Sequence, residues 1–228
     1  MKKLVNDRMN PWPCIKGKDI PATIDLDPVI YNYAPTCAMV LDIGCACGKV
    51  SIPLSKHGYS VTGIDINTDV LELAKDSSGP DWSPSPSFLK GNATALPFPD
   101  ETFDLTVMQA FLTTVVSKEE RDRIIREACR VLKPQSCLYI ADFGQTWHSK
   151  IYRERYINDL PVTKEEGSFL ACDEKTGECD YVAHHFTEKE LVFLLIENGF
   201  EVVFFKRDTF VTRTGNRVNG FVVVGRKS

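Results

Sequence analysis

The amino-acid sequence predicts an α/β fold built on a mostly parallel β-sheet. Two observations support this prediction. From residue 40 onward, strand-like stretches alternate with stretches of helical periodicity, which is the order expected of βα units. In addition, residues 40–48 are an apolar run that ends in a glycine-rich turn, and in open α/β sheets such turns lie at the ligand-binding edge.

Short apolar runs bounded by polar or glycine-containing turns define the expected strands. We expect strands at residues 39–43, 59–64, 88–92, 103–109, 137–141, 200–205 and 221–224. The run at 103–109 is the clearest, because it alternates in part and follows the turn at Pro99 and Asp100. The last two runs are joined by a polar loop around Gly215, which predicts a terminal pair of strands.

Helical spacing of apolar residues predicts four helices. They cover residues 49–56, 67–75, 118–132 and 187–198. The third is strongly amphipathic, and Pro134 marks its end. Thr187 and Glu190 form the pattern of a capping box at the start of the fourth, and Gly199 suits a left-handed residue at its end.

Three segments fall outside this alternation, at residues 1–35, 76–87 and 144–182. We expect a single domain over residues 1–228, in which 144–182 is an insertion on the substrate side. Residues 1–35 are expected to form a lid over the bound ligand. Trp12, Tyr31 and Tyr33 would supply its apolar cover, and ordinary packing of an N-terminal helix explains these three aromatic residues equally well.

The overall charge argues against several classes of partner. The formal net charge is −4 and the sequence pI is about 5.6, so no global positive field attracts nucleic acid or an anionic membrane. No apolar run approaches the roughly 18 residues that would span a bilayer. The basic start of the chain lacks the apolar core of a signal peptide. We therefore expect a cytoplasmic protein without a membrane span, for which nucleic acid is not the partner.

The chain contains eight cysteines, and in the cytoplasm these are expected to be reduced thiols. Cys172 and Cys179 flank what reads as the tip of a β-hairpin, where they can face each other. We nevertheless expect no functional pairing between them. Their spacing from His184 and His185 does not match a zinc knuckle, so no metal site is expected.

The turn at residues 42–48 carries the chemistry. Asp42 ends the first strand, and Gly44 and Gly48 allow the backbone to approach a ligand closely. The helix that follows offers free N–H groups to an anionic part of that ligand. A dinucleotide fingerprint would need glycine at the positions of Ala46 and Lys49, so a nicotinamide oxidoreductase is disfavoured.

This turn resembles motif I of the class I S-adenosylmethionine-dependent methyltransferases, with Ala46 in place of its middle glycine. Three further matches follow in the family's order: Asp65 at the end of the second strand, the segment 91–104 with its Leu-Pro-Phe-Pro-Asp stretch, and residues 124–134. The resemblance is close over about residues 40–141. It is closest to the ubiquinone and menaquinone C-methyltransferase branch, also called methyltransferase type 11.

The resemblance implies a Rossmann-like, doubly wound sheet of seven strands with helices on both faces and an antiparallel last strand. It also implies S-adenosylmethionine as the cofactor and S-adenosylhomocysteine as the product. The residues that the family's motifs assign to the cofactor fall into four groups. They are Asp42, Gly44, Cys45 and Gly48 around the methionine moiety, Asp65 and Ile66 at the ribose and adenine edge, Asn92 and Ala93 at the adenine, and Gln109, Ala110 and Phe111 near the methyl group.

Each of these residues also has a structural explanation. Asp42 could simply cap the following helix, and Cys45 and Cys47 are better explained as small turn residues than as nucleophiles. At Asn92 the family more often has an aspartate, and the amide oxygen can still accept a hydrogen bond from the adenine amino group. The ordered set of motifs favours the cofactor interpretation.

The acceptor is expected to be a small molecule that receives the methyl group by in-line displacement. A base is needed only if the acceptor must first lose a proton, and the candidates are Asp142, His148 and His185, with Tyr152 and His184 nearby. Two alternatives remain, an RNA or protein methyltransferase and a non-catalytic S-adenosylmethionine-binding module. The absence of an Asn-Pro-Pro-Tyr-type motif after the fourth strand disfavours methylation of amino groups on bases or glutamine. The sequence predicts neither the methylated atom nor the oligomeric state.

Overall fold

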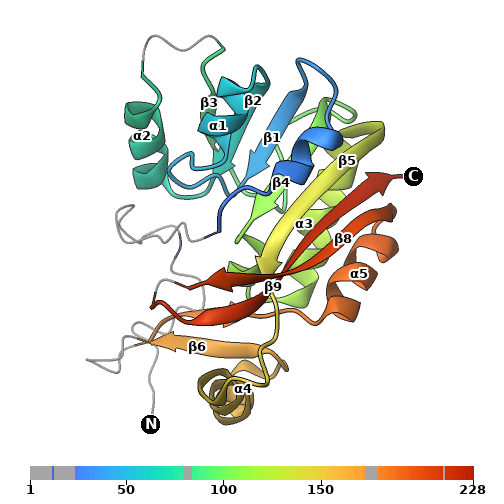
Figure 1. Ribbon diagram of the computed structural model, residues 1–228. Coiled ribbons are helices and arrows are strands. Elements are labelled where there is room, and N and C mark those ends of the chain that lie inside the picture. The colour runs from blue at the N-terminus through green and yellow to red at the C-terminus, as the bar shows by residue number, and fades with distance from the viewer. Residues whose placement is uncertain (1–11, 13–23, 80–83, 173–178, 213) are drawn as a thin grey trace.

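The computed structural model describes Trp12 and residues 24–79, 84–172, 179–212 and 214–228 (Figure 1). Its centre is a seven-stranded sheet in the order β3-β2-β1-β4-β5-β9-β8. The strands are β1 (Met39–Ile43), β2 (Ser60–Asp65), β3 (Ser87–Lys90), β4 (Phe103–Gln109), β5 (Leu132–Phe143), β8 (Phe200–Val211) and β9 (Arg217–Lys227). The first five are parallel, whereas β9 is antiparallel to both β5 and β8. The predicted Rossmann-like sheet with an antiparallel last strand is confirmed.

The predicted helices form, with boundaries shifted by a few residues. They are α1 (Ser51–Lys56), α2 (Thr68–Ser77), α3 (Lys118–Val131) and α5 (Glu188–Glu197), accompanied by the short 3₁₀ helices η2 (Pro28–Asn32) and η3 (Leu112–Thr114). The start of α5 is the capping box predicted from Thr187 and Glu190. Side-chain oxygens of Asn67 and Ser117 likewise accept hydrogen bonds from the first turns of α2 and α3.

Alternation along the central strands separates two apolar layers. In β5, Tyr139 packs on one side of the sheet with Leu54 of α1 and Ile30 of η2. Its neighbour Ile140 packs on the other side with helices α3 and α5. Because both faces of this strand are covered, it is buried almost throughout from Cys137 onward.

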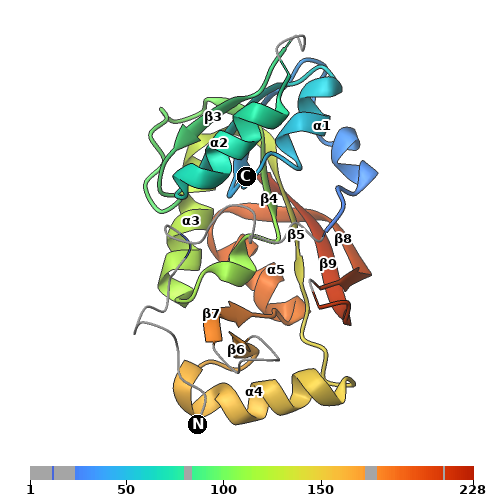
Figure 2. The ribbon, with the colours of Figure 1, turned by 90° about the vertical axis from the view of Figure 1, so that its left-hand side faces the viewer.

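An additional unit follows β5 and lies beyond the sheet. It consists of α4 (Lys150–Thr163) and the antiparallel pair β6 (Ser168–Cys172) and β7 (Cys179–His184). Figures 1 and 2 place α4 at the opposite end of the molecule from α1 and α2. The sequence did not reveal α4, because its apolar residues do not follow one face: Ile157 is exposed beside the buried Tyr156.

Two expectations are corrected by this arrangement. Cys172 and Cys179 face each other across the β6–β7 pair and form a disulfide, so these two cysteines are not the reduced thiols expected. Strands β8 and β9 are longer than predicted, because their pairing continues through polar residues. Strand β5 is also longer, because it already begins at Leu132, which pairs with Phe103 of β4. Among the described helices, none has the length and apolar character that a membrane span requires.

Candidate active site

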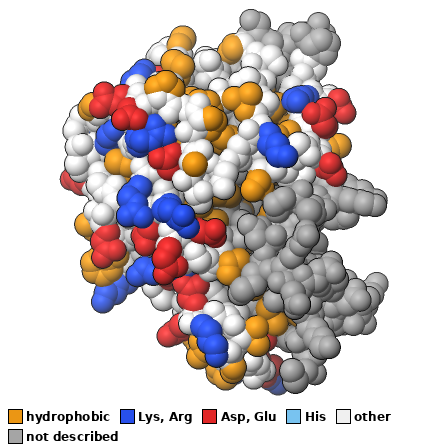
Figure 3. Space-filling model, turned by 180° about the vertical axis from the view of Figure 1, so that it is seen from behind, with side chains coloured by type: hydrophobic (Ala, Val, Ile, Leu, Met, Phe, Trp, Pro, Cys, Tyr) orange, Lys and Arg blue, Asp and Glu red, His pale blue; other side chains and the backbone are white. Residues whose placement is uncertain are grey.

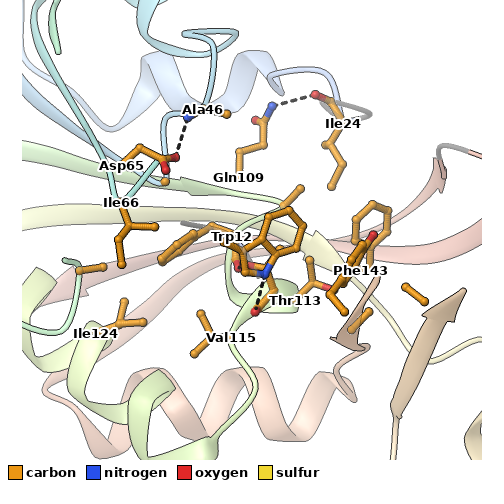
Figure 4. Close-up of a pocket in the computed structure, with 18 of the residues that line it drawn as sticks. Trp12, Ile24, Ala46, Asp65, Ile66, Gln109, Thr113, Val115, Ile124 and Phe143 are labelled. Atoms are coloured by element: carbon orange, nitrogen blue, oxygen red, sulfur yellow. Dashed lines mark hydrogen bonds between the residues drawn. The ribbon is translucent and has the colours of Figure 1, made fainter. Parts of the chain in front are cut away.

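A cavity of about 280 Å³ opens at the carboxyl ends of β1, β2 and β4 and extends to the β6–β7 pair (Figure 4). This is the edge at which open α/β sheets bind ligands. Ten of the eleven predicted cofactor residues line it: Asp42, Gly44, Cys45, Asp65, Ile66, Asn92, Ala93, Gln109, Ala110 and Phe111. Gly48 does not line the cavity. A Cβ there would lie 3.1 Å from the Phe88 ring, so Gly48 serves the packing behind the turn.

The turn after β1 is held in place by backbone hydrogen bonds. The amides of Gly44 and Cys45 donate to the Ile64 carbonyl at 2.8 and 3.1 Å. Gly44 has a φ of 74°, and a Cβ on this residue would overlap the ring of Phe111. Glycine is therefore required for both the conformation and the space of this turn.

Asp42 both contacts the start of α1 and lies in the wall of the cavity. Its carboxylate accepts a 2.6 Å hydrogen bond from the Ser51 hydroxyl and so ties β1 to the start of α1. The residue is 1% exposed and still lines the cavity. Burial raises the pKa of Asp42 to about 7, with a further contribution from the charge on Asp65.

Asp65 lies at the end of β2 with both carboxylate oxygens anchored. One oxygen accepts a hydrogen bond from the Ala46 amide at 3.0 Å, and the other accepts one from the Asn67 amide at 2.9 Å. Burial raises the pKa of this carboxyl despite these bonds. A carboxylate offers about four lone-pair sites, so acceptor capacity remains on Asp65 for a ligand.

Gln109 presents a buried acceptor at the end of β4. Its Nε2 donates to the Ile24 carbonyl at 2.8 Å, as Figure 4 shows. Its Oε1 is buried and has no hydrogen-bond partner among the described residues. A buried oxygen without a hydrogen-bond partner costs folding free energy. Because Gln109 lines the cavity, a ligand that carries a hydrogen-bond donor could supply the missing partner.

The side chain of Asn92 lines the cavity, but its oxygen is engaged in local hydrogen bonds. Its Oδ1 accepts hydrogen bonds from both the amide and the hydroxyl of Thr94, each at 2.9 Å. These bonds use both lone pairs of the oxygen. The side chain therefore shapes the turn after β3 in the manner of an Asx turn, and the expected acceptance of an adenine amino group conflicts with this geometry.

Cys45 is a buried thiol in the cavity wall. Burial raises its pKa strongly, and the charges on Asp42 and Asp65 raise it further. The sulfur is therefore protonated and a poor nucleophile at neutral pH. This agrees with the interpretation of Cys45 as a small turn residue.

The three candidate bases occupy different surroundings. His185 lines the cavity, whereas Asp142 and His148 do not. His148 is exposed, and Asp142 is fully buried beneath η3. Asp142 accepts hydrogen bonds from the amides of Thr113 and Phe143 at 3.1 and 2.8 Å, and burial raises its pKa to about 7. It therefore holds the turn after β4, which is the capping role that competes with catalysis.

The half of the cavity away from the turn after β1 is lined by residues that belong to no recognisable sequence motif. Tyr152 and Arg155 of α4, Phe169 of β6 and Tyr181 of β7 line it. The guanidinium of Arg155 lies over the rings of Tyr152 and Phe169, at 5.3 and 5.7 Å from their centroids. These residues come together only through the pairing of β6 with β7 and the packing of α4 against β6.

Only Trp12 of the three proposed lid residues reaches the cavity. Figure 4 shows its indole in the middle of the cavity, with Asp65 on one side and Phe143 on the other. Its Nε1 donates to the Thr114 carbonyl at 3.2 Å. Tyr31 and Tyr33 instead pack in the ordinary way, against His57 and Phe204. Residues 1–11 and 13–23 lie outside the described part of the chain.

A second cluster of ionisable residues joins the additional unit to the rest of the domain. The ligating atoms of Glu165, His184 and Glu190 lie within 4.8 Å of one another, a grouping that a metal ion could use. The guanidinium of Arg121 already lies beside both acids: it forms an ion pair with Glu165 and lies 3.9 Å from Glu190. The cluster is therefore explained as a partly buried ion-pair network.

The chain matches known proteins throughout this region. The family model of a methyltransferase domain matches residues 41–140 of this chain. A SAM-dependent methyltransferase structure from Methanosarcina mazei is 51% identical, with a TM-score of 0.87, and the match covers 90% of this chain and 99% of that one.

Curated relatives are more distant. The ubiquinone/menaquinone biosynthesis C-methyltransferase of Shewanella sediminis is 28% identical over 170 residues, which cover 72% of this chain and 66% of the relative. A demethylmenaquinone methyltransferase of Renibacterium salmoninarum is 30% identical, over 57% of this chain and 52% of its own. The chain thus spans at most about two thirds of the length of these two relatives.

Proposed function

Because this chain belongs to the class I S-adenosylmethionine-dependent methyltransferases, we propose that it transfers the cofactor's methyl group to a small-molecule acceptor bound beside Tyr152, Phe169 and His185. The observation that carries this proposal is the continuity of the cavity. One end is formed by the motif residues of β1, β2 and β4, and the other by the additional unit. Cofactor and acceptor can therefore bind in one enclosed space.

The residues of the first half fit S-adenosylmethionine. The Asp65 carboxylate can accept both ribose hydroxyl protons, and the orphaned Oε1 of Gln109 can accept a hydrogen bond from the cofactor's ammonium group. A Cβ on Gly44 would displace the Phe111 ring, so the bare backbone keeps this ring in place in the cavity wall. We assign Gly44, Asp65 and Gln109 to the cofactor on these grounds, and Ile66 because it follows Asp65 and lines the same part of the cavity.

The bound cofactor would supply an activated methyl group, because its sulfonium carries a positive charge. The protein's own contribution is then position and exclusion of water, which can lower a barrier by up to about 7–11 kcal/mol when the geometry is ideal. The protonated thiol of Cys45 does not compete with the acceptor for the methyl group. Apolar and aromatic side chains, among them Phe143 and Tyr181, line the acceptor half and would help to exclude water from it.

Two observations favour a small acceptor over RNA or a protein. The acceptor half is closed in by α4, the β6–β7 pair and Trp12, which leaves little room for a polymer. On the face seen in Figure 3, basic and acidic side chains are interspersed, so this face offers no continuous basic track for a phosphate backbone. The names of the Shewanella and Renibacterium relatives also refer to small quinone-type molecules.

Calorimetry with S-adenosylhomocysteine tests the cofactor half. Asp65→Ala removes two charge-assisted hydrogen bonds to the ribose and should weaken binding by about tenfold to a few hundredfold. Asp76→Ala, which removes an exposed acid of α2, is the matched control and should leave binding unchanged. Equal affinity in both variants would remove the ribose assignment.

A turnover screen tests the transfer itself. S-adenosylmethionine labelled in the methyl group is incubated with the protein and pools of small molecules, and S-adenosylhomocysteine formation is measured by mass spectrometry. Acceptor-dependent product is expected. Binding of S-adenosylhomocysteine without turnover in any pool would favour a non-catalytic binding module.

A further inference from the structure

The imidazole of His185 is held rigidly at the acceptor end of the cavity. It stacks on Phe143, with centroids 5.6 Å apart and an interplanar angle of 25°. Phe169 meets it edge-on at 4.9 Å, and Tyr152 lies at 5.1 Å. The backbone amide of His185 donates to the Gly167 carbonyl at 3.0 Å, which fixes the residue along the chain as well. The side chain is 3% exposed and still lines the cavity.

A short chain of hydrogen bonds decides which ring nitrogen carries the proton. The amide of Thr146 donates to the Tyr156 hydroxyl oxygen at 3.1 Å, and this oxygen lies 2.8 Å from Nδ1 of His185. Burial raises the pKa of Tyr156, so the phenol keeps its proton. The phenol has one proton to donate, and Nδ1 lies within hydrogen-bond distance of its oxygen, so we assign this proton to the bond with Nδ1. Nδ1 therefore accepts, and Nε2 carries the ring's own proton.

The surroundings also keep this ring uncharged. Burial lowers the pKa of His185 to about 3, and the charges of His184 and Arg155 lower it further. The ionisable groups around the ring are Arg155, Tyr152 and Tyr156 from α4 and His184 from β7. Among the described residues, no carboxylate is hydrogen-bonded to the imidazole. No proton is therefore stabilised on Nδ1, and Nε2–H is a neutral donor at physiological pH.

Building on the proposed function, we propose that His185 is a specificity-determining residue whose Nε2–H donates a hydrogen bond to the methyl acceptor. It selects molecules that present a hydrogen-bond-accepting atom at this position, and it does not act as the general base. Tyr156 is the positioning residue that sets the tautomer. Nε2 of His185 makes no hydrogen bond to any of the described residues. Its proton is therefore left for a ligand.

Nitrogen-15 NMR of histidine-labelled protein with bound S-adenosylhomocysteine tests the tautomer. The chain has four histidines, and comparison with the His185→Phe spectrum assigns the signals of His185. We expect a pyrrole-like Nε2 and a pyridine-like Nδ1, without titration between about pH 5 and pH 8. In Tyr156→Phe, the Nδ1 shift should change, because its donor is gone. A protonated Nδ1, or titration of His185 in this range, overturns the proposal.

Affinity for a matched pair of probes tests the donor. Quinoline and naphthalene have nearly the same shape, but only quinoline carries an acceptor nitrogen. Equilibrium dialysis against protein saturated with S-adenosylhomocysteine gives the quinoline-to-naphthalene affinity ratio. We expect this ratio to fall by about two- to tenfold in His185→Phe, which is the size of one net hydrogen bond. His185→Gln, which keeps an N–H donor, should restore part of it.

The outcomes separate this inference from the proposed function. An unchanged ratio in His185→Phe, or failure of quinoline to bind the wild-type protein, overturns the donor role of His185. Loss of S-adenosylhomocysteine binding by the wild-type protein would instead overturn the proposed function, whatever the histidine spectrum shows. Calorimetry with S-adenosylhomocysteine also confirms that each variant is folded, because its cofactor affinity should match that of the wild-type protein.

Discussion

The backbone of Gly44 lies directly against the ring of Phe111, so that a Cβ on Gly44 would overlap the ring. The contact joins the turn after β1 to the segment after β4, two strands that are neighbours in the sheet. Both residues line the cavity. The shape of the cofactor half therefore depends on the absence of one side chain.

Gly44→Ala should reduce both stability and cofactor affinity. The new methyl group would force the Phe111 ring to move, at a cost of about 1–3 kcal/mol in unfolding free energy. Gly215→Ala is the matched control, because Gly215 has a similar φ of 79° but nothing within 4 Å of its Cβ position. We expect S-adenosylhomocysteine affinity to fall about tenfold in Gly44→Ala alone. Similar losses in both variants would attribute the effect to backbone strain.

Arg121→Met should strongly destabilise the protein. Arg121 is 1% exposed and forms an ion pair with Glu165, and its loss would leave two partly buried carboxylates, those of Glu165 and Glu190, without this cation. Breaking a buried pair from one side costs about 3–5 kcal/mol. Urea unfolding measures this loss. Arg123→Met, an exposed position on the same helix, should change stability by less than about 0.5 kcal/mol. Equal values for the two would show that the network contributes nothing.

Asp142→Asn should alter the pH dependence of stability. The pKa of Asp142 is raised to about 7 in the folded protein, well above the value of about 3.9 in an unfolded chain. The folded state therefore holds more protons between pH 4 and 7. The contribution of Asp142 to the free energy of unfolding is therefore greatest at low pH. It falls as the pH rises, by up to about 1.4 kcal/mol per pH unit.

The stability difference between wild-type protein and Asp142→Asn isolates this effect. The titrations of Asp42 and His185, whose pKa values are shifted in opposite directions, are present in both proteins and cancel. The difference, wild type minus variant, should decline from about pH 4 to pH 7 in chemical denaturation. A constant difference would mean that Asp142 titrates alike in the folded and unfolded chains.

Cys172→Ser should lower thermal stability under non-reducing conditions. The disulfide to Cys179 closes a short loop, and in the chain-entropy account such a crosslink contributes roughly 2–3 kcal/mol. Dithiothreitol should bring the wild-type protein down to the variant's melting temperature. Cys37→Ser, which changes an exposed free thiol and keeps the disulfide, is the control and should melt at the same temperature as the wild-type protein. A wild-type protein insensitive to reductant would show that the disulfide adds no stability.

Much of the fold could be predicted from the sequence, because it depends on interactions between residues that are close together in the chain. The capping box at Thr187 and Glu190 satisfies backbone groups within one turn, so its signal lies within four residues. The turn at Gly44 is equally local, since a positive φ and a close backbone approach both demand glycine there. Together with Asp65, these features predicted the sheet, the helices around it and the family.

The acceptor half depended on contacts between distant segments. Tyr156 and His185 are 29 residues apart, yet their hydrogen bond sets the proton position on the imidazole. The sequence marked His185 as a candidate base, and only the packing around it shows a buried, neutral ring. Asp142 changed from a candidate base to a support of η3 in the same way. Burial and partner atoms determine the chemistry of such groups, and both arise only when the chain is folded.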